Sequence, residues 1–144
     1  MKKELMDYMV RSGQLRIRQV DKEKIKSIIK SAEINVIVVK NISLSEDSAT
    51  VIFREIYESV RQLGDAQWWL LGYEPLNHEA SLEILKEMKI KESTLLNHLV
   101  RFKKIRNDAN YRGFRISMLQ AKELIDFWDS CGTEIIRAIS KSVK

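Results

Sequence analysis

The sequence predicts an all-α fold, in the form of an antiparallel up-and-down four-helix bundle with a short N-terminal extension. Apolar residues recur at spacings of three and four along most of the 144 residues. One proline and five glycines leave long stretches without a helix breaker, and a chain of this length can bury the core of one domain. We therefore expect residues 1–20 to form the extension, whose shape is not predicted, and residues 21–144 to form one helical domain.

The first long helix is expected to begin after Asp21, whose side chain can accept a hydrogen bond from the first turn. The β-branched run at residues 34–39 would also suit a strand. Such a strand would have no partner and would leave its backbone groups unpaired, so we predict a helix there. The apolar face of this helix consists of Ile25, Ile28, Ile29, Ala32, Val36 and Val39.

The second long helix is expected to have its N-terminal signature at residues 45–48 and to end near Gly72. Ser45 is followed by Glu46 and Asp47, a composition typical of a helix N-terminus. Gly72 and Pro75 then predict a turn. The core-facing residues of this helix are Ala49, Ile52, Phe53, Ile56, Val60, Leu63, Gln67 and Leu70.

The third helical stretch is expected to begin after Asn77, its N-cap, and to end before Gly113. The pattern permits a break between Lys89 and Glu92, after which helical spacing resumes. The apolar residues of this stretch are Leu82, Leu85, Met88, Leu95, Leu96, Leu99 and Phe102.

The fourth long helix is expected to begin with a capping box formed by Ser117 and Gln120. Four such helices joined by short loops form an up-and-down bundle. The residues that this helix is expected to bury are Leu124, Ile125, Trp128, Ile135 and Ile139.

The positive charge of the chain is concentrated in one segment, residues 101–115. This segment holds six cations and one acid, a net charge of +5 that equals the net charge of the whole chain. A concentrated positive charge attracts phosphate and releases counterions, which favours RNA, DNA or a nucleotide as the partner. A solvated cationic helix end is the alternative interpretation. The six cations are Arg101, Lys103, Lys104, Arg106, Arg112 and Arg115.

Arg106 is the most informative single residue of this segment. Helical spacing from Leu99 and Phe102 places it on the apolar face, where an unpaired guanidinium is unfavourable. Either its side chain extends past the core into water, or it lines a cleft at the bundle end or a subunit interface and awaits an anion. The polar residues that cluster beside it are Asn107, Asn110 and Tyr111.

Two segments carry a resemblance to a known family. Residues 106–111 read RNDANY and precede the last helix, and Gly72, Pro75 and His78 follow a G-x-x-P-x-x-H pattern at the start of the third helical stretch. This arrangement resembles the HEPN domains, four-helix bundles with an arginine, four to six residues and a histidine near the end of the third long helix. The resemblance covers about residues 21–140 and implies a homodimer.

The chain departs from the HEPN ribonucleases at Tyr111, which stands where they have histidine. In their metal-independent reaction the arginine stabilises the phosphorane and the histidine activates the ribose hydroxyl. A tyrosine with an ordinary pKa near 10 is a poor base at pH 7 but can donate a hydrogen bond to phosphate. RNDANY is similar to a subgroup paired with MNT-type nucleotidyltransferases. Gly113 stands where adenylylated relatives carry the acceptor tyrosine.

The resemblance therefore implies two functions. The first is a nucleotide- or RNA-binding or regulatory protein that acts with an MNT-type nucleotidyltransferase in a toxin–antitoxin-like module. The second is a metal-independent endoribonuclease that uses Arg106 and Tyr111 as catalytic residues. The candidate phosphate- or RNA-binding residues are Arg101, Lys103, Lys104, Arg106, Asn107, Asn110, Tyr111, Arg112 and Arg115.

The histidines, two tryptophans and the cysteine could also take part in binding or catalysis, but the pattern around most of them favours a structural role. His78 is expected to start a helix. His98 lies beside an apolar face and is expected either to be half-buried or to contact a ligand. One of Trp68 and Trp69 is expected in the core and the other free to stack on a base. Cys131 is expected in the core.

Several classes of site and of localisation are not indicated by the sequence. No metal or cofactor is expected, because neither cysteine nor histidine occurs at zinc-ligand spacing and no P-loop motif is present. Glu4 and Asp7 interrupt the apolar stretch that a signal peptide requires, and no later segment is long and apolar enough for a membrane span. A cytoplasmic location is expected.

Overall fold

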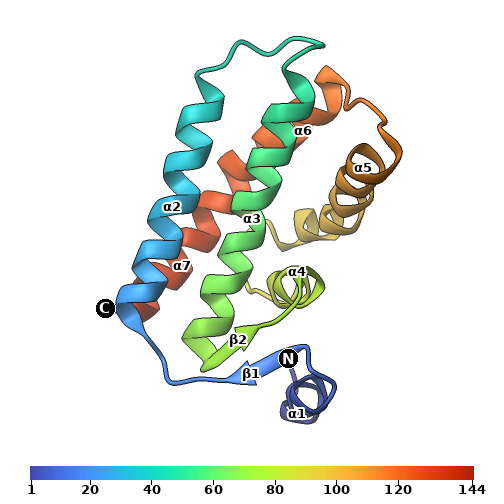
Figure 1. Ribbon diagram of the computed structural model, residues 1–144. Coiled ribbons are helices and arrows are strands. Elements are labelled where there is room, and N and C mark those ends of the chain that lie inside the picture. The colour runs from blue at the N-terminus through green and yellow to red at the C-terminus, as the bar shows by residue number, and fades with distance from the viewer.

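The computed structural model describes residues 1–144 and is mostly helical, with one two-stranded sheet (Figure 1). The predicted all-α class is confirmed at this level. In chain order the elements are α1 (Lys3–Arg11), β1 (Leu15–Ile17), α2 (Lys22–Lys40), α3 (Ala49–Leu71), β2 (Tyr73–Pro75), α4 (His78–Lys86), the 3-10 helix η1 (Ser93–His98), α5 (Leu99–Arg112), α6 (Met118–Phe127), the π-helical turn η2 (Trp128–Gly132) and α7 (Thr133–Val143).

The start of α2 and the end of α3 agree with the predictions. The Asp21 side chain accepts a hydrogen bond of 3.0 Å from the backbone N–H of Lys24, and residues 34–39 are helical. α3 ends at Gly72, whose φ of 91° is a left-handed conformation that favours glycine.

The N-terminal signature at residues 45–48 directly precedes α3, whose N-cap is Ser48 and whose first residue is Ala49. The hydroxyl groups of Ser45 and Ser48 each accept a hydrogen bond from the backbone N–H of the other, at 3.1 and 2.9 Å. These bonds close a turn of their own ahead of Ala49, the first residue of the helix. Serine side chains support a turn and a helix cap equally well, so the composition does not distinguish the two.

The third helical stretch contains the break that the pattern permitted. Asn77 caps α4 by accepting a hydrogen bond of 2.8 Å from the N–H of Ala80, and α4 ends before the segment that leads to η1. α5 follows η1 directly and ends at Gly113, with φ of 70°. α2 and α3 lie in the plane of Figure 1, whereas α4 is seen nearly end-on and therefore crosses α3 steeply.

The fourth stretch begins as predicted and is interrupted once. Ser117 and Gln120 form the complete capping box at the start of α6. The π-helical turn at Trp128–Gly132 then separates α6 from α7. Of the residues expected in the core here, Ile125 is only half-buried, whereas Leu124, Trp128, Ile135 and Ile139 are buried.

Residues 1–20 contribute a helix, a strand and part of a small core. β1 pairs antiparallel with β2, with Leu15 opposite Pro75 and Ile17 opposite Tyr73. A cluster separate from the main core joins these residues to the end of α3 and to α4; its buried members are Met9, Leu15, Trp68, Ala80 and Ile84.

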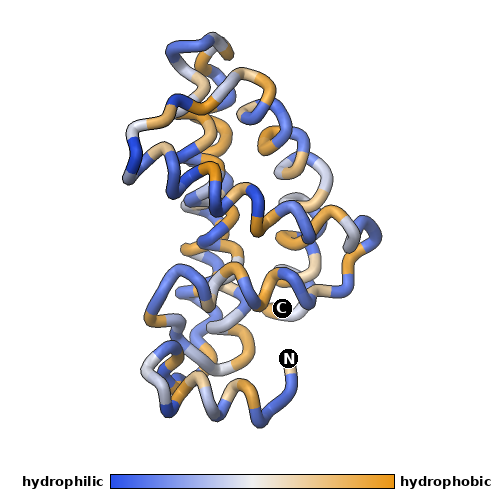
Figure 2. Tube along the Cα trace, turned by 90° about the vertical axis from the view of Figure 1, so that its right-hand side faces the viewer, coloured by the Kyte–Doolittle hydropathy of each residue, from blue (hydrophilic) through white to orange (hydrophobic).

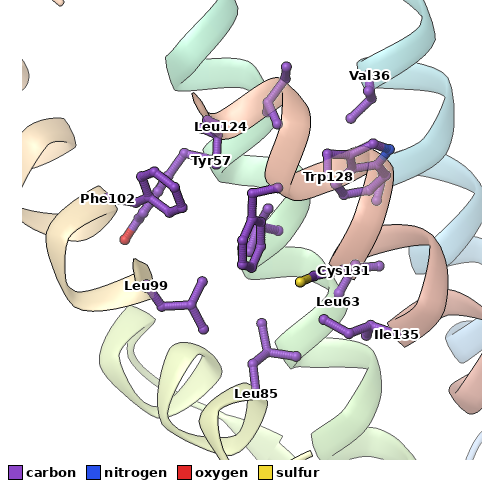
Figure 3. Packing of buried hydrophobic residues seen from close by; sticks show 14 of the residues in the cluster. Val36, Tyr57, Leu63, Leu85, Leu99, Phe102, Leu124, Trp128, Cys131 and Ile135 are labelled. Carbon is purple, nitrogen blue, oxygen red and sulfur yellow. The ribbon is translucent and has the colours of Figure 1, made fainter. Parts of the chain in front are cut away.

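The main core surrounds α3, which packs against α2, α4, α5, α6 and α7. Figure 3 shows Leu99 and Phe102 of α5, Leu85 of α4 and Trp128 converging on this helix. Hydrophilic and hydrophobic residues alternate along the helices in Figure 2, as amphipathic helices around one core require. This core fixes the position of α5 and of the basic segment that it carries.

Candidate functional site

Arg106 lies half-buried at the edge of the main core. Its guanidinium carbon is 5.7 Å from the centroid of the Tyr57 ring of α3, a cation–π geometry. Its Nη1 donates a hydrogen bond of 3.2 Å to the side-chain oxygen of Asn107. Arg106 forms no ion pair with any carboxylate, which leaves most of its donors free for another group.

Tyr57 is the aromatic surface beneath this guanidinium. The residue is 3% exposed and belongs to the main core (Figure 3). Burial raises the pKa of its hydroxyl to about 12, although the nearby charges of Arg106 and Arg61 favour the ionised form. Tyr57 is therefore neutral at pH 7 and provides the ring face rather than an acid or a base.

Arg61 lies one turn further along α3 and, unlike Arg106, is fully paired. Its Nε donates to both carboxylate oxygens of Glu58 at 3.1 Å, and its Nη1 donates to Asp65 at 2.8 Å. Asp65 also accepts a hydrogen bond from the hydroxyl of Ser81 in α4. Burial raises the pKa of Asp65 above its ordinary value, against the effect of these two donors.

His78, the first residue of α4, lies within electrostatic range of both arginines. Partial burial lowers the pKa of its ring, and the positive charges of Arg61 and Arg106 lower it further, whereas Glu58 and Asp65 act in the opposite direction. We call Tyr57, Arg61, His78 and Arg106 the Arg106 cluster. The prediction that His78 starts a helix is confirmed, but the sequence did not indicate its arginine neighbours.

The other cations of the basic segment each meet a carboxylate. Most of these pairs are exposed, and such pairs contribute about 0–1 kcal/mol and yield readily to a competing anion. With Arg106 included, the segment has six cations and four nearby carboxylates. The local excess of positive charge is therefore smaller in the fold than in the sequence. The pairs are Arg101 with Glu123, Lys103 with Glu79, Lys104 and Arg112 with Asp108, and Arg115 with Asp47.

α5 distributes the predicted site residues over different sides. The bond of Lys103 to α4 and that of Arg101 to α6 mark two opposite flanks of the helix. Arg106 lies on the α4 flank. At about 100° per residue Tyr111 lies about 140° away from it. Tyr111 is 78% exposed and its side chain forms no hydrogen bond, so the two do not share a site within one chain.

The remaining candidate residues of the segment lie on the surface. Asn107 is half-buried and bonded to Arg106, whereas Asn110 is exposed, one turn beyond Arg106 on the same flank. The side chain of Arg115 is exposed, and its Nη2 donates a hydrogen bond of 3.1 Å to the backbone carbonyl of Glu46. The structure therefore brings together Arg106, Asn107 and the α4 flank rather than the whole segment.

The prediction that one of Trp68 and Trp69 is free is wrong. Trp68 is 0% exposed and Trp69 is 8% exposed. The Trp68 ring N–H donates a hydrogen bond of 2.7 Å to the carbonyl of Ala80, and the amine of Lys24 lies 4.4 Å from the Trp69 ring centroid. The N-terminal residues cover this end of α3, which the helical pattern did not reveal.

Cys131 and His98 complete the candidate residues. Cys131 is buried as predicted, and burial raises the pKa of its thiol. His98 is exposed rather than half-buried; its Nδ1 lies 3.3 Å from Arg101, and its ring is 6.2 Å from that of Phe102. η1 ends at His98, and α5 begins at the next residue.

No protein-family model matches the chain, and neither a curated protein nor a solved structure matches it. The HEPN resemblance therefore rests on the residues alone. None of the helices combines the length and the apolar composition that crossing a bilayer requires. No three histidine, cysteine, aspartate or glutamate side chains lie close enough to hold a metal ion.

Proposed function

We propose that this protein is a HEPN-type nucleotide- or RNA-binding or regulatory protein, acting in the cytoplasm with an MNT-type nucleotidyltransferase in a toxin–antitoxin-like module. The observation that carries the proposal is Arg106, a half-buried guanidinium with no carboxylate partner. A guanidinium in this position presents a planar pair of donors that matches phosphate. The aromatic ring of Tyr57 supports it from below.

The charges around Arg106 support the same proposal. The exposed cations of α5 attract a polyanion over several ångströms, and their weak ion pairs open when phosphate approaches. Arg106 then supplies the stronger contact, because a partly desolvated guanidinium interacts more strongly than an exposed one. This division of roles suits a phosphate-bearing ligand better than an apolar one.

We further propose the finer fold and assembly that the resemblance implies. α2, α3, the α4–α5 stretch and the α6–α7 stretch would be the four arms of an up-and-down bundle. Two copies would pack through the faces that carry Arg106. Tyr111, Phe114 and Leu119, which are 78%, 57% and 71% exposed, offer apolar area at this end of the molecule, although Tyr111 lies on another side of α5 than Arg106.

The second candidate function is a metal-independent endoribonuclease that uses Arg106 and Tyr111. The observation that favours it is the free hydroxyl of Tyr111, which has no partner in the chain and is open to a substrate or to a second copy. In that reaction Arg106 would stabilise the phosphorane and Tyr111 would assist proton transfer. A phenol is a weaker general base than the imidazole that it replaces, which makes this the weaker candidate.

One pair of assays tests the proposed function. Binding and cleavage of structured and single-stranded RNA are measured in EDTA for wild type, Arg106→Ala and the control Lys104→Ala, an exposed cation on the same helix. We expect binding without cleavage by wild type, about tenfold weaker binding by Arg106→Ala, and a smaller loss for Lys104→Ala. Equal losses in the two variants would mean that Arg106 has no special role.

Tyr111 separates the two candidate functions. For a binding protein, Tyr111→Phe weakens binding by about 0.5–1.5 kcal/mol, the value of one net hydrogen bond, and reveals no cleavage. Tyr111→His supplies a base with a pKa near 6.5. In a dimer that brings residue 111 of one copy beside Arg106 of the other, this change is expected to create slow cleavage that depends on Arg106. Cleavage by purified wild type, lost in both Arg106→Ala and Tyr111→Phe, would instead establish the ribonuclease.

A further inference from the structure

The start of α4 is held between α3 and α5. Asp65 of α3 accepts a hydrogen bond from Ser81, one turn after His78. Glu79, the residue that follows His78, forms an ion pair with Lys103 of α5, one turn before Arg106. These two contacts hold the first turn of α4, to which His78 belongs, between the two helices, and the charges of Arg61 and Arg106 both act on the His78 ring.

The charges that face His78 come from both neighbouring helices. In α3, Arg61 forms ion pairs with Glu58 and Asp65. In α4, the helix of His78, Glu79 forms an ion pair with Lys103. Arg106 of α5 is the charge without a counterion. Partial burial lowers the pKa of His78 most, and the charges of Arg61 and then Arg106 lower it further, so the fold without a ligand favours the neutral ring.

An anion bound at Arg106 changes the electrostatic environment of His78 in the opposite direction and raises the pKa of its ring. Its negative charge offsets the guanidinium and favours the protonated imidazole, which then offers an additional N–H donor. The positive end of the α4 helix dipole acts on the same anion. Tyr111 does not take this role within the chain, because it projects about 140° away from Arg106 around α5.

We propose that His78 is the second phosphate-binding residue of the Arg106 site, that it binds in its protonated form, and that the ligand group is a phosphate monoester. The inference rests on the proposed function and adds the ligand group to it. Arg106 and a protonated His78 supply two positive charges, which match a monoester dianion such as a nucleoside monophosphate or a 5′-phosphorylated RNA end. An internal phosphodiester carries one negative charge and is matched by Arg106 alone.

Calorimetry tests this inference with two short single-stranded RNAs of the same sequence, one with a 5′-phosphate and one with a 5′-hydroxyl. Titrations at pH 6.5 and pH 8.0, in buffers with different ionisation enthalpies and equal ionic strength, report affinity and proton uptake. The proteins are wild type, His78→Gln and, as the matched control, His98→Gln, which replaces the only other histidine. Both histidines are exposed, so both variants are expected to fold.

We expect wild type and His98→Gln to bind the 5′-phosphorylated RNA several-fold more tightly at pH 6.5 than at pH 8.0, with proton uptake. His78→Gln should bind it no more tightly at pH 6.5 than at pH 8.0, because the phosphate monoester itself gains protons toward its second pKa of about 6. The 5′-hydroxyl RNA should bind more weakly and equally at both pH values. In NMR titrations the pKa of the His78 ring should rise when the phosphorylated RNA is bound.

Three different results would overturn the inference, and they are distinguishable. Arg106-dependent binding with the same pH profile in wild type and His78→Gln would exclude His78 and leave the proposed function intact. Equal, pH-independent affinity for the two RNAs would exclude the monoester. No binding of either RNA by wild type at either pH would overturn the proposed function and this inference together.

Discussion

Tyr57 and Arg106 show how a single contact makes the candidate site depend on the core. The ring that supports the guanidinium is itself buried, so the position of Arg106 follows from the packing of α5 on α3. The two residues lie far apart in the sequence. Helical spacing predicts that Arg106 is at the edge of an apolar face, but it does not predict which ring lies beneath it.

Burial of the Tyr57 hydroxyl predicts a loss of stability at alkaline pH. Its pKa is about 12 in the folded chain and about 10 in the unfolded chain, so the stabilisation is complete below pH 10 and is lost as the pH rises toward 12. We expect wild type to lose about 1 kcal/mol more than Tyr57→Phe between pH 9 and pH 11. Urea unfolding at both pH values measures this difference. The control Tyr111→Phe, at an exposed position, should behave as wild type; equal pH dependence in all three proteins would contradict the prediction.

Local hydrogen bonds explain which element boundaries the sequence predicts. The caps at Asp21, Asn77 and Ser117 each join residues three apart, and all three are confirmed. Pairing of β1 with β2 joins residues about sixty apart, and it has no local signal beyond the short alternation in LRIRQV. The Arg106 cluster likewise cannot be predicted from local sequence, because its members come from α3, α4 and α5 and only tertiary packing brings them together.

The close contact between α3 and α4 predicts that adding one methyl group at Gly64 strongly lowers the stability of the fold. A Cβ atom added at Gly64 would lie 1.9 Å from the carbonyl oxygen of Ser81, which is backbone and has little freedom to move. Gly64→Ala should therefore separate the two helices and destabilise the protein by about 3 kcal/mol. The control Arg54→Ala, at an exposed position of the same helix, should change stability by less than about 0.5 kcal/mol. Similar midpoints of urea unfolding for both variants would contradict the prediction and show that α4 can shift without a loss of stability.

At the scale of the whole molecule, the fold redistributes the positive charge that the sequence concentrates. Carboxylates from α4, α6 and the segment before α3 approach the basic segment, although they are distant in the sequence. The local charge of residues 101–115 therefore overstates the field that a ligand meets. The position of the basic segment at one side of the molecule is predictable from the sequence, but this partial neutralisation is not.

The neutralising carboxylates predict a modest salt dependence of RNA binding. Each cation that contacts single-stranded RNA contributes about 0.7 to the slope of log affinity against log salt. Replacing Lys103, Lys104, Arg112 and Arg115 together by alanine should lower the slope by less than the value of about 3 that four full phosphate contacts would give. Filter binding at several salt concentrations measures the slope. An unchanged slope and affinity would show that these four cations are only solvated surface.

Two exposed apolar surfaces compete as the interface of the proposed dimer. One is the outward face of α2, where Ile34, Ile37 and Val38 are 47%, 62% and 58% exposed. The other lies beside the end of α5, where Phe114 and Leu119 are 57% and 71% exposed. Each surface is small compared with the roughly 800 Å² per partner of a standard interface. The surface beside α5 lies at the end of the helix that carries Arg106, so the proposed dimer uses it.

The proposed dimer therefore predicts different effects of two similar substitutions. Leu119→Glu places a charge beside the end of α5 and should produce a monomer, because a buried carboxylate without a partner is strongly unfavourable. Ile37→Glu places the same charge on α2, at a comparable exposure, and should leave the dimer intact. Light scattering coupled to size-exclusion chromatography at tens of micromolar measures both. Dissociation by Ile37→Glu alone would move the interface to α2 and separate it from the Arg106 site. A monomeric wild type would remove the dimer from the proposed function and leave each Arg106 site to bind phosphate within one chain.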